Sequence, residues 1–227
     1  MRRRASEAVE KMDLPDCDSE RLERTYRQFA VVNGAVSGWR RLYVREIRPL
    51  LSAGPTTVLD VGSGGGDLAV TLARWSARDR LPLHVTGIDP DTRAHRFASA
   101  RPPVAGVEFR CAHTTELLRE GLTFDLVMSN HVLHHLQPAG LGQFLADSEA
   151  LARRKVLHND LRRSPAAYAL FAVAALPFRG SFIREDGLTS IRRSYTLQEL
   201  EALAPPGWHA ERTSAFHQML ACRKDFG

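Results

Sequence analysis

The ten residues from Val58 to Asp67, VLDVGSGGGD, constrain the fold of this chain more than any other segment. An apolar run typical of a buried strand leads directly into four glycines, and a helical pattern begins at Asp67. Glycines between a strand and a helix let the backbone turn sharply and approach a ligand closely, with the amides of the helix N-terminus facing it. The segment therefore predicts the first strand–loop–helix unit of a nucleoside-binding sheet.

Short apolar runs alternate with helical patterns after this loop, which indicates βαβ units and a parallel sheet. The chain has 227 residues, the size of one ordinary domain with a full hydrophobic core. We expect a single domain over 1–227, made of an N-terminal helical cap (1–52), a cofactor-binding core (53–160), a lid insertion (161–195) and a C-terminal helix with two strands (196–227). The expected strands lie at 57–61, 83–88, 107–111, 124–129, 155–159, 209–214 and 217–223.

The cap and the insertion have their own local signals. Asn33-Gly34 predicts a break between two helices of the cap. An apolar helix is expected over Pro165–Leu176, and Arg179–Ser194 is expected to be irregular. Thr196, followed three residues later by Glu199, has the spacing of a capping box and predicts the start of a helix.

Acidic residues around the glycine loop indicate the charge of its ligand. Asp67 stands where a dinucleotide-binding loop needs a small residue, and its carboxylate would repel a pyrophosphate. Together with Asp60 it favours a positively charged ligand, such as the ammonium and sulfonium of S-adenosylmethionine. Asp89 ends the next strand, in GIDP, where an acid can accept hydrogen bonds from both ribose hydroxyls.

These motifs make the sequence similar, over nearly its whole length, to the class I S-adenosylmethionine-dependent methyltransferases. The resemblance implies an α/β, Rossmann-like fold with a seven-stranded, mostly parallel sheet whose last strand is antiparallel. It implies S-adenosylmethionine as cofactor and S-adenosylhomocysteine as product. Many relatives carry an aspartate for adenine after the third strand, whereas this chain has Ala112-His113-Thr114, so His113 or backbone groups would recognise adenine. The implied cofactor-binding residues are Asp60, Gly62, Ser63, Gly64, Gly66, Asp89, Pro90, His113, Thr114 and Asn130.

Methyl transfer is an in-line displacement that needs an aligned acceptor, and a hydroxyl acceptor also needs a base. The strand ends where relatives place such groups offer His134, His135 and Asp160. We expect one of the two histidines to act as general base, with Asp160 orienting it and stabilising its cationic form. The alternatives are that one histidine only packs structurally and that Asp160 caps the following helix.

Several other chemistries fit the sequence less well. A magnesium-assisted mechanism could use Asn159-Asp160 as hard ligands, but the companion acid after the fourth strand is replaced by Ser129-Asn130, so no metal is expected. The Pro-Pro-Tyr type of motif that accompanies N-methylation of DNA or protein amides is also missing there. RNA methylation usually accompanies a broad basic surface, and this chain has little excess positive charge beyond its N-terminal arginines.

The insertion suggests a small acceptor. Its apolar and aromatic side chains suit an aromatic or lipid-like molecule, and its arginines could bind a carboxylate or a polarised carbonyl. Segments of it also resemble bacterial methyltransferases of quinone and polyketide pathways. We therefore expect methylation of a phenolic or enolic oxygen of such a metabolite; the alternatives are carbon methylation of a quinone-like ring and a non-catalytic S-adenosylmethionine-binding protein. The expected acceptor contacts are His131, Arg162, Tyr168, Phe171, Arg192 and Tyr195.

Composition adds expectations about partners and compartment. The net charge is +5, of which Arg2, Arg3 and Arg4 supply three, leaving 5 − 3 = +2, so this tail is expected to be solubilising and no nucleic-acid partner is expected. The longest apolar run is too short to span a membrane, and the twin arginines lack the apolar stretch of a secretory signal. The three cysteines lack metal-ligand spacing, which favours a cytoplasmic protein. The oligomeric state is left open.

Overall fold

The sheet has the expected number and direction of strands. A computed structural model describes residues 1, 3–52 and 54–224, and within these ranges seven strands form one sheet in the order β3-β2-β1-β4-β5-β7-β6. Strand β7 is antiparallel to both of its neighbours, and all other pairings are parallel. The predicted α/β fold is therefore confirmed. The strands are β1 (Thr56–Val61), β2 (Leu83–Ile88), β3 (Val107–Arg110), β4 (Phe124–Asn130), β5 (Ala152–Leu161), β6 (Trp208–Arg212) and β7 (His217–Arg223).

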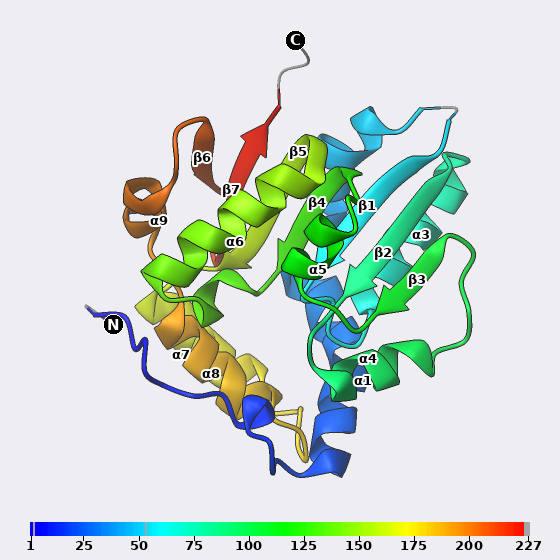
Figure 1. Cartoon of the computed structure of the whole chain (residues 1–227). Coiled ribbons are helices and arrows are strands. Elements are labelled where there is room, and N and C mark those ends of the chain that lie inside the picture. Colours follow the sequence, from blue (N-terminus) through cyan, green and yellow to red (C-terminus); the bar gives the residue numbers. More distant parts are fainter. Residues whose placement is uncertain (2, 53, 225–227) are drawn as a thin grey trace.

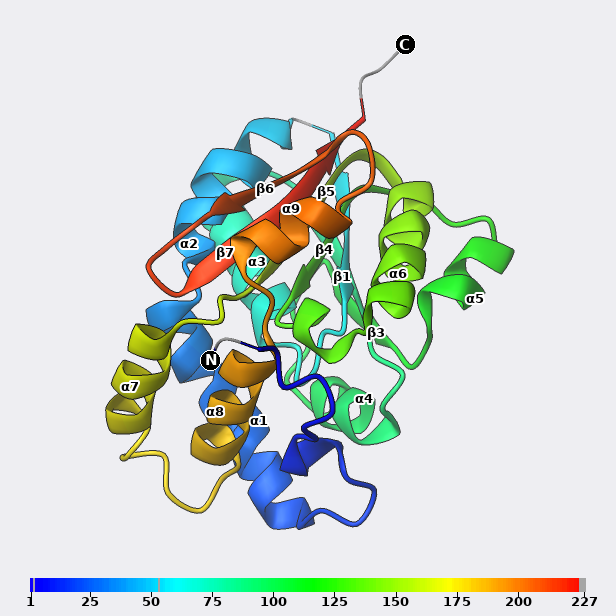
Figure 2. The same cartoon turned by 90° about the vertical axis from the view of Figure 1, so that its left-hand side faces the viewer.

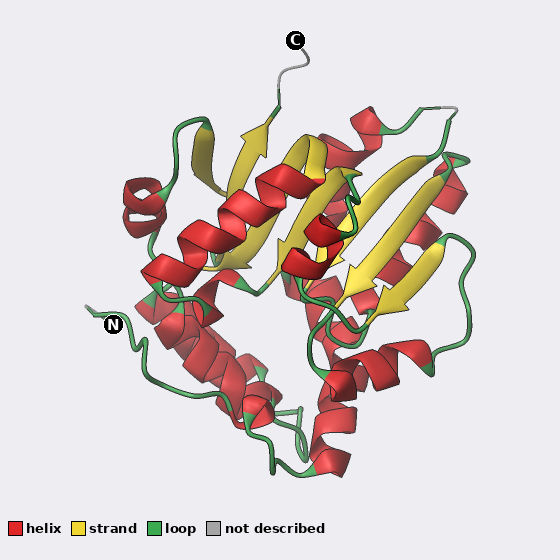
Figure 3. Cartoon of the chain, in the orientation of Figure 1, coloured by secondary structure: helices red, strands yellow, loops and turns green. Residues whose placement is uncertain are grey.

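Helices surround the sheet on both faces and at one edge (Figure 3). The α-helices are α1 (Ser19–Val36), α2 (Trp39–Leu42), α3 (Asp67–Asp79), α4 (Thr92–Ser99), α5 (Thr114–Arg119), α6 (Pro138–Leu151), α7 (Pro165–Ala174), α8 (Ile183–Arg193) and α9 (Leu197–Leu203). The shorter turns are the 3₁₀ segments η1 (Lys11–Asp13), η3 (Arg48–Leu50) and η4 (Leu133–His135) and the π-helical η2 (Tyr43–Ile47).

The strands are apolar on both sides because each face of the sheet is covered. Leu59 and Val127 pack on one face with residues of α6, whereas Val58, Leu126 and Met128 pack on the other with residues of α2, η2 and α3. In Figure 1, α5 and α6 lie in front of the sheet and α3 lies behind it. The alternation of side chains along each strand thus builds two separate cores.

A helical cap covers the edge of the sheet at which the parallel strands end. Leu22 and Tyr26 of α1, Ala94 of α4 and Phe182 beside α8 form a third buried cluster. Figures 1 and 2 show α1, α7 and α8 gathered at this edge, with the beginning of the chain lying alongside α8. We call residues 3–14 the N-terminal strap.

Backbone and side-chain contacts fasten the strap. Ala5 N donates to Arg192 O (3.0 Å), while Lys11 N and Met12 N donate to the Asp186 carboxylate (2.8 and 3.0 Å). Arg4 donates to the carbonyl oxygens of His134 and Leu136 (both 2.8 Å) and lies over the Tyr195 ring. The prediction of a solubilising basic tail is therefore wrong for Arg4; Arg2 lies outside the described residues.

Two local predictions also fail, both because tertiary contacts override a weak local signal. Helix α1 continues through Asn33-Gly34 to Val36, and the Asn33 side chain donates to Asp67 (3.0 Å). The stretch expected to be irregular contains helix α8, which buries Ile183 and Ile191. The predicted capping box is confirmed, because Thr196 Oγ1 accepts from Glu199 N (3.3 Å) and Glu199 Oε2 accepts from Thr196 N (2.8 Å).

Candidate active site

The glycine loop is fixed between β1 and α3 by its own geometry. Gly62 N and Ser63 N both donate to Ile88 O at the end of β2 (2.8 and 3.0 Å). Gly62 has φ = 69°, and a Cβ there would lie 2.6 Å from Val132 Cγ2. Gly66 has φ = 75°, and a Cβ there would clash with Phe109 Cζ. Side chains are excluded at both positions, so the loop backbone stays close to the strand ends.

Three predicted carboxylates face one cavity beside this loop. Asp60 at the end of β1, Asp67 at the start of α3 and Asp89 after β2 all line it, with Gly62, Ser63 and Gly64. Asp89 Oδ2 accepts from Gly64 N (2.9 Å) and its Oδ1 from Asp91 N (2.9 Å), which ties β2 to the loop. The parallel strands bring these acids together because they all end at this edge of the sheet.

The three carboxylates are buried near one another, and Arg101 partly compensates the charge of Asp67. Burial raises the pKa of all three, and the neighbouring Asp67 and Asp89 raise that of Asp60 further. Asp60 Oδ2 is buried and has no hydrogen-bond partner among the described residues. A ligand that brings a cation or N–H donors would relieve this repulsion and satisfy the buried oxygen.

The other predicted cofactor contacts divide into two groups. Pro90 and Asn130 line the cavity, and Asn130 Oδ1 accepts from Trp39 Nε1 (2.8 Å). Gly66, His113 and Thr114 lie outside the lining. His113 is exposed at the start of α5, and Thr114 Oγ1 donates to Asp147 Oδ2 (2.7 Å). The structure thus brings neither polar side chain of the predicted adenine contact to the cavity.

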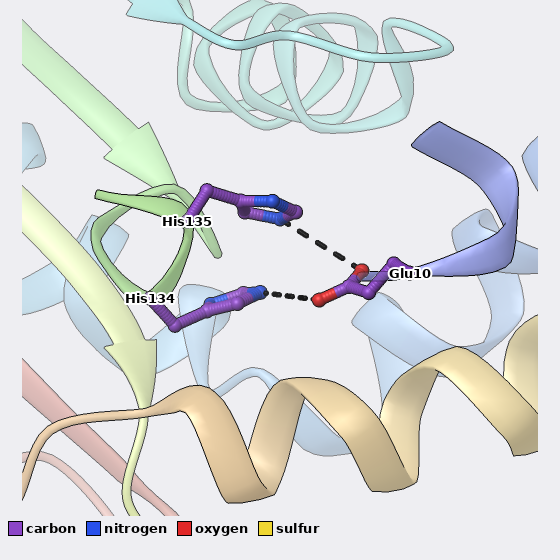
Figure 4. Close-up of side chains that lie close together, drawn as sticks. All are labelled: Glu10, His134 and His135. Carbon is purple, nitrogen blue, oxygen red and sulfur yellow. Dashed lines mark ion pairs between the residues drawn. The ribbon is translucent and has the colours of Figure 1, made fainter. Parts of the chain in front are cut away.

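The predicted histidines lie at the other end of the same cavity. His134 is buried in η4, and its Nδ1 lies 2.7 Å from Asp160 Oδ1, while Asp160 Oδ2 accepts from His134 N (2.8 Å). On the opposite side, His134 Nε2 lies 3.3 Å from Oε1 of Glu10 in the strap (Figure 4). Glu10 is itself buried and accepts from Ser190 Oγ (2.9 Å).

This arrangement holds a proton on His134. Burial by itself lowers the pKa of an imidazole, but the carboxylates of Asp160 and Glu10 outweigh burial and raise the pKa of His134 to about 10. Burial likewise opposes ionisation of the two acids, yet His134 lowers the pKa of each to about 2. Glu10, His134 and Asp160 therefore form a buried ion triad at neutral pH.

His135 differs from His134 in access and partners. Its side chain is 32% exposed and lines the cavity. His135 Nε2 lies 3.8 Å from Glu10 Oε2 (Figure 4). Its Nδ1 lies 3.3 Å from Asp13 Oδ2. The ligand-type atoms of Glu10, His134 and His135 all lie within 4.8 Å of one another, a spacing that a metal ion could also bridge.

Only two of the six predicted acceptor contacts line the cavity, namely His131 and Phe171. Arg162 lines a separate cavity and donates to Ala215 O (2.8 Å). Tyr195 is buried and donates its hydroxyl to Leu136 O (2.7 Å). Tyr168 is half-buried and Arg192 is exposed, both outside the lining.

The cavity contains residues that the motifs did not indicate. Glu10 and Asp13 come from the strap, Asn33 from α1 and His217 from the start of β7. Its volume is about 550 Å³, and the described residues that line it include no lysine or arginine. The apolar side chains from α7 and α8 that cover it include Leu170, Phe171, Ile183 and Ile191.

A sheet of this order, with a glycine loop and a ribose-type acid at adjoining strand ends, defines the class I methyltransferase fold. Comparison with known proteins agrees, because residues 58–155 match the family described as methyltransferase domain. The resemblance seen in the sequence is confirmed over this segment.

Individual relatives and solved structures extend the comparison. A ubiquinone biosynthesis O-methyltransferase of Methylobacterium sp. (strain 4-46) is 33% identical over 123 residues, 52% of this chain. The match covers 46% of that relative, so the chain spans less than half of its length. Human N-acetylserotonin methyltransferase in complex with SAM has a TM-score of 0.64 at 14% identity, covering 92% of this chain and 57% of that chain. Magnesium protoporphyrin IX methyltransferase (ChlM) from Synechocystis PCC 6803 with bound SAH has a TM-score of 0.56 at 16% identity, covering 89% and 86%.

Within the described residues, none of the helices combines the length and the apolar character required to cross a membrane.

Proposed function

We propose that this chain is an S-adenosylmethionine-dependent methyltransferase that methylates a phenolic or enolic oxygen of a small aromatic, polyketide or quinone-like metabolite. One observation carries the proposal: a single cavity joins the carboxylate-lined glycine loop to His131, His134 and His135. The activity of the ubiquinone biosynthesis relative supports an oxygen acceptor.

The cofactor would lie at the glycine loop. Asp60 and Asp67 supply negative charge for its ammonium and sulfonium, and the oxygens of Asp89 can accept from the ribose hydroxyls. When bound, S-adenosylmethionine supplies a methyl group on a positively charged sulfur. The unpartnered Oδ2 of Asp60 fits a ligand that brings both a cation and N–H donors.

Of the two histidines, the contacts favour His135 as the base. His134 keeps its proton at neutral pH, because the pKa of this imidazole is raised to about 10. His135 reaches the cavity, and Asp13 near its Nδ1 favours a proton on that nitrogen, which leaves Nε2 to accept the proton of an acceptor hydroxyl. Asp160 would then act on His134, fixing the η4 turn that carries both histidines.

The lining also limits the acceptor. Apolar side chains of the lid helices cover the cavity, and its described lining offers no guanidinium or ammonium to a carboxylate. This favours a neutral, largely apolar acceptor over an anionic one. Carbon methylation of a quinone-like ring is the alternative within the same site, because the same base could act on an activated ring.

Transfer from S-adenosylmethionine labelled with ¹³C in its methyl group tests the proposal. The acceptor panel contains phenols, catechols and hydroxylated quinols, and the product spectrum distinguishes an O-methyl from a C-methyl group. His135→Gln should lower kcat by about 10²- to 10⁴-fold, whereas His209→Gln, at an exposed position on β6, should leave it unchanged. Turnover by His135→Gln equal to that of the wild type would exclude His135 as the base. Cofactor binding without methyl transfer to any acceptor would favour a non-catalytic binding protein.

A further inference from the structure

A second histidine pair lies in the cavity apart from the ion triad. His131 Nε2 and His217 Nε2 are 3.1 Å apart, and both side chains line the cavity. His131 follows β4, and His217 begins β7, so two strand ends on either side of β5 meet at this contact. Two ring nitrogens at this distance share one hydrogen, so one imidazole donates and the other accepts.

Ser214 decides which histidine donates. Its Oγ accepts from Phe216 N (3.2 Å) and from His217 N (3.0 Å), and it lies 3.3 Å from His217 Nδ1. The oxygen already has two donors, so its O–H is free to donate to His217 Nδ1. A His217 whose Nδ1 accepts carries its hydrogen on Nε2, and that hydrogen is donated to His131 Nε2.

Both rings are neutral in this arrangement. Burial and the neighbouring His217 lower the pKa of His131 to about 3, and burial lowers the pKa of His217 to about 4. A neutral His131 that accepts at Nε2 carries its hydrogen on Nδ1. That nitrogen has no hydrogen-bond partner among the described residues.

The backbone of His131 is fixed in an uncommon conformation. Its φ is 60°, in the left-handed region that few non-glycine residues occupy. Its N–H donates to Asn159 O (2.9 Å), which pins the residue to the end of β5. Such a conformation is costly and persists only where the surrounding contacts hold it, so the imidazole is preorganised at the cavity wall.

We propose that His131 is a specificity-determining hydrogen-bond donor. Its Nδ1–H binds an oxygen of the methyl acceptor that is adjacent to the oxygen that is methylated. His217 and Ser214 are positioning residues that fix this tautomer of His131. The inference rests on the proposed function and names the substrate class more closely. The Nδ1–H of His131 would select acceptors with two neighbouring oxygens, such as a catechol or an ortho-hydroxy carbonyl compound, over a simple phenol. Losing one neutral hydrogen bond corresponds to about a tenfold preference.

NMR of the full chain labelled with ¹⁵N in its histidines tests the tautomer without any ligand, because it distinguishes protonated from unprotonated ring nitrogens. The expected result is a hydrogen on Nδ1 of His131 and on Nε2 of His217. His217→Leu should leave His131 in a mixture of tautomers, while His209→Leu, at an exposed position on β6, should change nothing at His131. A hydrogen on Nε2 of His131, or a charged His131, would overturn the proposal.

Titration of the same sample then identifies the oxygen. S-Adenosylhomocysteine is added first, followed by catechol or phenol; the Nδ1 signal of His131 should move with catechol, and less with phenol. A shift of the His131 Nδ1 signal with S-adenosylhomocysteine alone would show that this N–H binds the cofactor carboxylate. No shift of the signal with catechol would overturn the role of His131 in acceptor binding. Failure of S-adenosylhomocysteine to bind would count against the proposed function, whereas the tautomer result is independent of it. In turnover, His217→Leu should lose the roughly tenfold preference for catechol, and His209→Leu should retain it.

Discussion

Glu10 Oε1 in the N-terminal strap lies 3.3 Å from Nε2 of His134 in the turn after β4. Asp160 at the end of β5 holds the other nitrogen of the same imidazole. One charged ring thus joins the strap to two strands of the sheet, and the strap in turn brings Glu10 and Asp13 to the cavity. The beginning of the chain is therefore part of the candidate active site.

Glu10→Gln should destabilise the chain, because it leaves the charge on His134 with only one buried carboxylate. Breaking a buried pair of this kind costs about 3 kcal/mol, which urea unfolding would measure. Glu7→Gln, on an exposed residue of the same strap, is the matched control and should stay within about 0.5 kcal/mol of the wild type. Equal stability of the Glu10 and Glu7 variants would mean that the triad does not hold the strap.

The triad also predicts how stability depends on pH. The pKa of His134 rises on folding from 6.5 to about 10, so the folded state binds this proton more tightly than the unfolded state. The contribution of His134 to the free energy of unfolding is therefore fully present below pH 6.5 and is lost as the pH rises towards 10. Glu10 and Asp160 have lowered pKa values, so their contributions are present above about pH 4.5 and lost as the pH falls towards 2.

Unfolding free energies of the wild type and of His134→Gln, measured from pH 5 to pH 10, would check this dependence. The difference between the two should be largest at about pH 5 to 6.5 and should shrink steadily at higher pH. A difference that is constant up to pH 10 would contradict a charged His134.

Asp60→Asn should weaken the binding of S-adenosylmethionine by roughly tenfold or more, because it removes a buried negative charge from the glycine-loop end of the cavity. Since burial and the neighbouring acids raise the pKa of Asp60, affinity in the wild type should also fall as the pH is lowered. Calorimetric titration would measure both effects, with Asp16→Asn at an exposed position as control. Unchanged affinity in Asp60→Asn would exclude this carboxylate from cofactor binding.

Chelation tests whether Glu10, His134 and His135 hold a proton or a metal ion. In our account ion pairs explain the cluster, so methyl transfer should be unchanged after treatment with EDTA. Activity that is lost on chelation and restored by Zn²⁺ would show instead that these three residues ligate a metal, since two histidines and a glutamate form a known zinc ligand set.

Local patterns predicted most of the fold and one end of the site. The loop before Asp67 and the acid at Asp89 could be recognised because strand, glycines and carboxylates follow one another in the sequence, and parallel strands bring their ends together. Glu10 and Asp13 could not, because nothing near them in the sequence indicates that the strap returns to η4. No sequence motif marks His217 either, because its contact with His131 depends on β4 and β7 lying on either side of β5 in the sheet.

The arginines illustrate the opposite error. Arg162 and Arg192 lie in segments of the insertion that suggested contacts to an acceptor. Arg162 instead lines a separate cavity, and Arg192 is exposed. The sequence could not show that α8 forms and turns Arg192 towards solvent, because the helix is stabilised by burying Ile183 and Ile191 in the folded chain. Contacts between distant segments decided both outcomes.

A crystal structure of the chain with S-adenosylhomocysteine bound tests the central claim most directly. The account predicts the ribose hydroxyls at Asp89, the ammonium beside Asp60 and Asp67, and the sulfur facing the part of the cavity lined by His131 and His135. The product at another site, or a sulfur that faces away from the histidines, would contradict a methyl-transfer site in this cavity.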